Sequence, residues 1–119
     1  MATAAEIRAG LDDYRQRCND NARLRKMLRS WTRHVHFTAT DTGDAFTVTI
    51  DKGEITDVQE GAVGTPDLVI AATSEDLTDM FWGDLNPAAK YLTGEIAVKG
   101  SADDVMRVDA MAALIWVDA

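Results

Sequence analysis

The chain has 119 residues, of which 46% are hydrophobic and 27% charged, a balance typical of soluble globular domains. This length predicts one domain, residues 1–119, and no apolar run approaches the ~18 residues that span a bilayer. The net charge of −8 disfavours nucleic acid as a partner, because a protein that binds phosphates needs a basic surface to neutralise them.

Two helices are predicted in the first third of the chain. Apolar side chains at helical spacing predict an amphipathic helix over about residues 4–18. Residues 19–21 break it and supply a new N-cap, and apolar residues from Leu24 to Trp31 predict a second short helix. We expect Cys18 to be a small buried thiol on the apolar side of the first helix rather than a nucleophile.

Basic residues gather in this first third. Residues 1–36 hold eight of the twelve Lys and Arg and four acids, whereas residues 37–119 hold four basic residues and sixteen acids. The centre of the cluster falls around the second predicted helix: Arg23, Arg25, Lys26 and Arg29. A solvated helix face is the simplest interpretation. The alternative is a patch that transiently contacts an anionic membrane surface or an acidic partner.

The hydrophobic period changes to two from Arg33 onward. Residues 33–40, 46–50 and 54–60 alternate apolar and polar side chains and are separated by turn sequences at 41–44 and 51–53. This pattern predicts an antiparallel three-strand meander with one apolar face. Such a face has to be covered by another layer of structure.

Two histidines fall on one face of the first predicted strand. The spacing of His34 and His36 could supply two metal ligands. No further histidine, second cysteine or inward-pointing carboxylate is placed to complete a site. We therefore expect exposed strand histidines and no metal site.

The second half predicts alternating strands and helices. Residues 67–73 are apolar on both faces and indicate an inner strand, and Thr73–Asp76 then starts a helix that ends at Gly83. Asn86 and Pro87 start a short helix, as cap and first helical residue, that stops at Gly94.

The C-terminal region predicts one more strand and one more helix. Ile96 and Val98 alternate with polar neighbours in a last strand. Ser101, followed by two aspartates, opens a C-terminal helix that is apolar nearly all round over residues 110–117.

No motif of a catalytic site stands out. The glycines are scattered singly at turns, and no nucleophile elbow is present. The neighbouring aspartates fall at helix starts or on solvent-exposed faces, and we expect them to act as caps and dipole partners. We expect no catalytic residues, no cofactor and no enzyme activity. The enzymatic alternative requires a buried aspartate with a shifted pKa, acting with Tyr14 or Tyr91.

The location prediction depends on the cysteine count and the two ends. A lone cysteine excludes an intramolecular disulfide, which fits a reducing compartment. Met1–Glu6 lacks the basic and apolar regions of a secretory signal, and Val117–Ala119 is not a peroxisomal address. We therefore expect a cytoplasmic protein.

Four segments resemble the sterol-carrier-protein (sterol-transfer) domain family. They are the meander over 46–60, the strand start at 66–70, the loop 83–87 and the segment Gly94–Gly100. The family pattern has a strand beginning with Pro-Asp, a Gly-x-Leu-Asn-Pro loop and a strand that ends in Lys-Gly. The resemblance covers about residues 22–112, and a stand-alone acidic domain is more similar to the bacterial members.

The resemblance implies an α+β fold with a five-stranded, mostly antiparallel sheet and helices packed on one face. It also implies an apolar tunnel between sheet and helices for a fatty acyl chain, a sterol or an isoprenoid, and no catalytic residues. We expect carriage of such a ligand. The alternative is a protein-interaction or homodimerisation domain that uses the apolar C-terminal helix.

The expected ligand site combines the apolar face of the sheet with large side chains of the second half. The predicted floor is Phe37, Phe46, Val48 and Ile70. The predicted walls are Met80, Phe81, Trp82, Tyr91, Met106, Met111 and Leu114.

Overall fold

The computed structural model describes residues 1–118, with side chains as far as Met111. Its helices are α1 (Ala4–Asp20), α2 (Ala22–Met27), α3 (Ser74–Trp82), α4 (Pro87–Thr93) and α5 (Ala102–Asp118). Its strands are β1 (Arg33–Ala39), β2 (Ala45–Asp51), β3 (Glu54–Glu60), β4 (Leu68–Ala72) and β5 (Ala97–Lys99).

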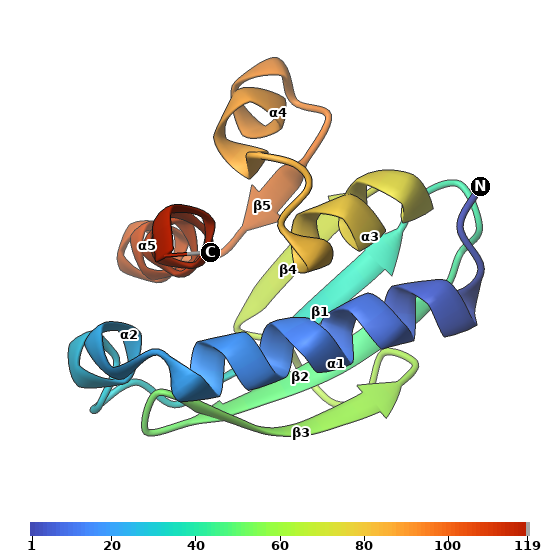
Figure 1. The fold of residues 1–119 in the computed structure, drawn as a ribbon. Coiled ribbons are helices and arrows are strands. Elements are labelled where there is room, and N and C mark those ends of the chain that lie inside the picture. The colour runs from blue at the N-terminus through green and yellow to red at the C-terminus, as the bar shows by residue number, and fades with distance from the viewer. Residues whose placement is uncertain (119) are drawn as a thin grey trace.

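The predicted α+β fold with a five-stranded sheet is confirmed. The strand order is β3-β2-β1-β4-β5, and every pair is antiparallel except β1 with β4. Figure 1 shows α1 and α3 side by side across the sheet, with α4 and α5 over the part that contains β5. No helix in residues 1–118 combines the length and apolar character needed to cross a bilayer.

The first helix buries the face that the helical spacing predicts. Ile7, Leu11, Tyr14 and Cys18 are all buried against the sheet side of α1. The helix starts at a capping box in which Thr3 and Glu6 satisfy each other's backbone N–H groups. This Thr-x-x-Glu spacing fixes the helix start at residue 4.

The second helix is shorter than predicted. It ends at Met27, so Trp31 is not part of it. Trp31 is instead buried, and its indole N–H donates to Asp104 of α5 over 2.8 Å. The prediction was wrong here because an apolar residue at helical spacing can also be anchored by a distant partner.

The loop between β3 and β4 covers part of the far face of the sheet. His36 is buried under it, and the ring Nε2 lies 3.0 Å from the carbonyl oxygen of Val63. Thr47 donates to the carbonyl of Gly61 and accepts from the N–H of Val63. The expected exposure is therefore wrong for His36, whereas His34 is exposed as expected.

The caps of the second half follow the predicted signals. Thr73 caps α3 and Asn86 caps α4. Gly83 and Gly94 end these helices with φ of 80° and 83°, in the left-handed region that favours glycine.

Gly100, between β5 and α5, lies where a side chain would not fit. A Cβ at this position would lie 2.4 Å from Cδ2 of Leu68. Glycine therefore permits a close approach between the segment that joins β5 to α5 and Leu68, the buried first residue of β4.

The outer edge of β3 is satisfied by polar side chains of α1. Asn19 accepts from the N–H of Ile55 and donates to its carbonyl, at 2.8 and 2.9 Å. Arg15 donates to the carbonyls of Ile55 and Thr56. At Ile55 and Thr56, these side chains supply hydrogen bonds of the kind that a neighbouring strand would make.

Candidate ligand pocket

A pocket of about 360 Å³ lies between the apolar face of the sheet and the helices. Its lining comes from α1, from the sheet and from α3, α4 and α5 with the segments between them. The lining residues are Leu11, Tyr14, Val35, Phe37, Val48, Ile50, Ile55, Ile70, Met80, Pro87, Ala88, Tyr91, Leu92, Ile96, Val98, Val105, Met106, Val108, Asp109 and Met111.

The floor of the pocket is built by strand alternation. Val35 and Phe37 come from β1, Val48 and Ile50 from β2, and Ile70 from β4. The register places Val35 opposite Val48 and Phe37 opposite Ile70, so these side chains share one face. The floor is consequently a continuous apolar surface.

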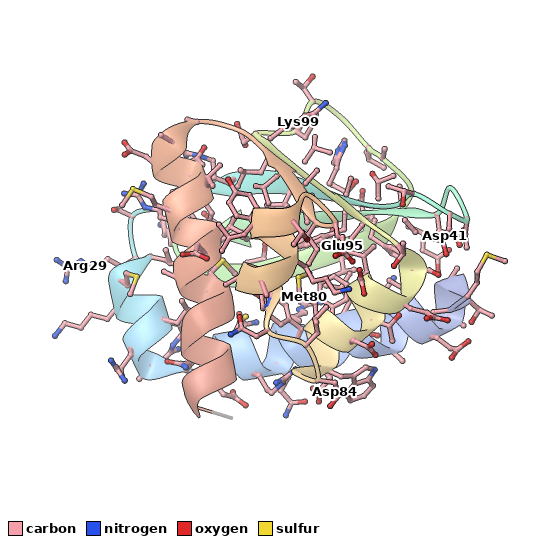
Figure 2. The ribbon with its side chains drawn as sticks, turned by 90° about the horizontal axis from the view of Figure 1, so that it is seen from above. Arg29, Asp41, Met80, Asp84, Glu95 and Lys99 are labelled. Atoms are coloured by element: carbon pink, nitrogen blue, oxygen red, sulfur yellow. The ribbon has the colours of Figure 1, made fainter. Side chains whose placement is uncertain are left out.

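The walls come from helices that pack differently. Met80 of α3 points toward the space under α4 and α5, as Figure 2 shows. Tyr91 and Leu92 of α4 and Met106 of α5 line the pocket while remaining exposed. With Leu92 84% and Met106 69% exposed, the pocket communicates with the surface at this side.

Seven of the side chains that the sequence singled out for a ligand site lie together on this lining: Phe37, Val48, Ile70, Met80, Tyr91, Met106 and Met111. Three others lie outside it: Phe46, Phe81 and Trp82. Leu114 falls beyond the last described side chain.

The three side chains outside the lining have other packing partners. Phe46 is buried in the core on the same strand as Val48. Phe81 lies behind the lining, with its ring centroid 5.5 Å from that of Tyr14 and 5.0 Å from that of Phe37. Trp82 packs on α1 at Gly10, where a Cβ would lie 2.9 Å from the indole Nε1.

Other lining residues were not predicted, although a signal for several of them exists. Val35 and Ile50 lie two residues from predicted floor residues, so the same alternation includes them. Leu11 and Tyr14 belong to the predicted apolar side of the first helix. Nothing in the sequence pattern points to Asp109.

The polar groups on the lining are few. The lining residues with polar side chains are Tyr14, Tyr91 and Asp109, and Asp109 is exposed. Burial raises the pKa of Tyr14 well above its usual value, and the neighbouring Cys18 raises it further. Burial likewise raises the pKa of Cys18 to about 12, so both groups keep their protons at neutral pH. Among the described residues, no group of three or more His, Cys, Asp or Glu side chains could hold a metal ion.

The wall formed by α5 is anchored at its first turn. Asp104 is buried, accepts from the indole of Trp31 and pairs with Arg33 at 3.0 Å. Arg33 and Arg107 also lie over the Trp31 ring, at 5.8 and 6.0 Å from its centroid. Desolvation acts to raise the pKa of Asp104, but hydrogen bonds from Trp31 and Arg33 outweigh it and hold that pKa below its usual value.

Comparison with known sequences gives one family match. The profile of the SCP-2 sterol transfer family matches residues 11–113, which include every lining residue. Among curated proteins, none matches the chain.

Solved structures share the fold at low sequence identity. A crystal structure of sterol carrier protein 2 is 15% identical over 91% of this chain and 94% of its own, with a TM-score of 0.67. A UbiJ-SCP2 ubiquinone synthesis protein is 15% identical over 92% and 94%, also at 0.67. The solution structure of palmitated SCP2L2 from Aedes aegypti is 16% identical over 96% and 95%, at 0.65.

Proposed function

The chain belongs to the SCP-2 sterol transfer family, and from this premise we propose that it binds and carries an apolar, lipid-like ligand in the pocket between sheet and helices. The apolar lining is the observation that carries the proposal. Ligand burial is then driven by apolar area removed from water, at about 25 cal/mol per Å².

The size of the pocket favours a slim ligand. Its volume of about 360 Å³ lies near the lower end of the roughly 300–1,000 Å³ of small-molecule sites. A single acyl chain or an isoprenoid suits this volume better than a branched or two-chain lipid. The palmitated state of the Aedes aegypti relative supports an acyl chain as one such occupant.

We propose carriage rather than catalysis. Among the described lining residues, only two tyrosines and one exposed aspartate have polar side chains. Tyr14, whose pKa is raised by burial, stays protonated and is a poor base. The proposed ligand contacts are Phe37, Val48, Ile70, Met80, Tyr91, Met106 and Met111.

A matched pair of substitutions tests the location of the site. The variant Met106→Glu places a carboxylate on the pocket wall, whereas Trp82→Glu places one on α3 outside the lining. Both side chains are at least partly exposed in the parent protein, and circular dichroism checks that both variants fold. With a neutral probe, such as a pyrene-labelled alkyl methyl ester, we expect Met106→Glu to weaken binding by at least about tenfold and Trp82→Glu to leave it unchanged.

The opposite result would contradict the proposed location of the ligand in this pocket. Loss of binding in a folded Trp82→Glu variant, with Met106→Glu unaffected, would place the ligand elsewhere. If the parent protein takes up no probe and forms a concentration-dependent dimer, an assembly domain becomes the better interpretation.

A second element of the proposal is transient contact with an anionic membrane surface through α2 and the residues that follow it. Arg25, Lys26 and Arg29 are exposed there, together with Met27, and Arg23 is also at the surface. Figure 1 shows α2 at the same end of the molecule as α5, which forms one wall of the pocket. A ligand leaving the pocket on this side would have a short path to the membrane.

Vesicle binding tests this contact. We expect the protein to sediment with phosphatidylserine-containing vesicles at low salt, to release at high salt and to ignore neutral vesicles. Lys26→Glu with Arg29→Glu should abolish the sedimentation. Equal binding to neutral vesicles, or binding that salt does not weaken, would contradict a charge-driven contact.

A further inference from the structure

The described pocket lining carries a negative charge and no positive charge. Asp109 of α5 is the only charged residue on the described lining, which contains no lysine, arginine or histidine. The chain beyond the described side chains also contains none of these types. No side chain on this wall is therefore available to neutralise an anion.

The basic residues next to lining positions have partners or point away. Lys90, which precedes Tyr91, lies 2.7 Å from Glu95 and 3.8 Å from Asp76. Arg107, which follows Met106, lies over the Trp31 ring.

The remaining neighbours are equally unsuited. Arg15 donates to backbone carbonyls of β3. His34, His36 and Lys99 alternate with Val35, Phe37 and Val98 of the lining, so they occupy the opposite face of the sheet. Figure 2 shows Lys99 on the side of the molecule away from Met80.

An ionised lipid head group has an unfavourable position in such a pocket. A carboxylate that is carried into the interior of the pocket leaves water without gaining a cation, and burial of an unpaired charge is strongly unfavourable. If the carboxylate stays at the open side of the pocket, where Met106 is exposed, it lies near Asp109 of the same helix, which is also exposed, and two like charges repel. A hydroxyl group can instead donate a hydrogen bond to Asp109, and an ester can accept one from the hydroxyl of Tyr91.

We propose that the pocket selects lipids with an uncharged polar end, such as long-chain alcohols and esters, and discriminates against free fatty acids. This inference rests on the proposed carriage of a lipid in this pocket. Asp109 acts as the specificity-determining residue, and the absence of a basic partner on the wall is what makes it effective.

Competition between matched ligands tests the selection. Palmitic acid, its methyl ester and cetyl alcohol share one chain length and differ at the polar end. At mildly alkaline pH and below their aggregation limits, they compete with the pyrene-labelled ester for the intact chain. We expect the alcohol and the methyl ester to displace the probe at concentrations at least about tenfold lower than the acid.

Two charge-reversing variants separate the local effect from net charge. Asp109→Lys supplies the missing cation, and we expect it to reverse the order so that the acid binds more tightly than the alcohol. Asp84→Lys makes the same change of net charge at an exposed position outside the lining and should keep the original order.

The two proposals fail in different ways. If the probe does not bind to the parent protein, the proposed function fails. If the probe binds but the acid competes as well as the ester, or Asp84→Lys reverses the order as Asp109→Lys does, carriage stands and the selection is overturned.

Discussion

The helix pair α1 and α3 and the helix pair α4 and α5 cover the same sheet in different ways. α1 and α3 approach closely at Gly10 and bury Ile7, Leu77 and Phe81. α4 has no buried residue, and α5 is anchored near its start by Asp104. The first pair thus seals a core, whereas the second leaves apolar side chains facing a pocket. Stability and ligand binding are therefore expected to depend on different residues.

The largest expected effect is on the free energy of unfolding, and it concerns the core that α1 and α3 cover. Phe81 is fully buried between the rings of Tyr14 and Phe37. Replacing it with alanine removes a large apolar side chain and leaves a cavity, so we expect Phe81→Ala to lower the free energy of unfolding by about 3–5 kcal/mol. Urea denaturation measures this change. A loss below about 1 kcal/mol would mean that this side is not closely packed.

An intermediate effect is expected at the anchor of α5. Asp104→Asn removes the charge that pairs with Arg33, whose side chain is 36% exposed and therefore partly screened by water. We expect a loss of about 1–2 kcal/mol in the free energy of unfolding. Loosening α5 should also weaken probe binding, whereas Asp103→Asn, at an exposed neighbouring position, should do neither.

The same anchor predicts a pH dependence. The pKa of Asp104 is lower in the folded protein than the value of about 4 expected in the unfolded chain. Its contribution is complete above that unfolded-state pKa and is lost as pH falls through the lower folded-state pKa. The stability difference between parent and Asp104→Asn should therefore be constant from about pH 5 to 8 and shrink below about pH 4. A difference that persists at lower pH would show that the charge is not its source.

The smallest expected effect on stability lies on the pocket side. Leu92 lines the pocket but is largely exposed, so Leu92→Ser should change the free energy of unfolding by less than about 0.5 kcal/mol. Probe binding should weaken about fivefold, because an apolar contact with the ligand is lost. A variant that is clearly destabilised yet binds normally would remove the distinction between the two helix pairs.

Local signals predicted most of the secondary structure. Alternation identified the three meander strands, and Asn86, Pro87 and Gly94 marked both ends of α4. The extent of α2 was overestimated because Trp31 has helical spacing but is held by Asp104, 73 residues away. Contacts at such separation leave no periodic pattern in the sequence.

Only some of the residues that line the pocket could be predicted from the sequence. Strand alternation placed Phe37, Val48 and Ile70 on one face, and all three line the pocket. Met80, Phe81 and Trp82 are consecutive on one helix, so successive side chains point about 100° apart and cannot share one wall. The glycine that accepts Trp82 lies on another helix, and its role becomes visible only in three dimensions.

The way in which α1 covers the outer edge of β3 bears on aggregation. Unpaired edge strands invite a second molecule to extend the sheet, and fibrils grow by the same pairing. Here Asn19 and Arg15 already bind the N–H and carbonyl of Ile55 and the carbonyl of Thr56. Glu54, Asp57 and Glu60 are exposed along the same strand and would meet their own copies in an edge-to-edge encounter. The fold can thus keep an open apolar pocket on one side of the sheet while this edge resists self-association.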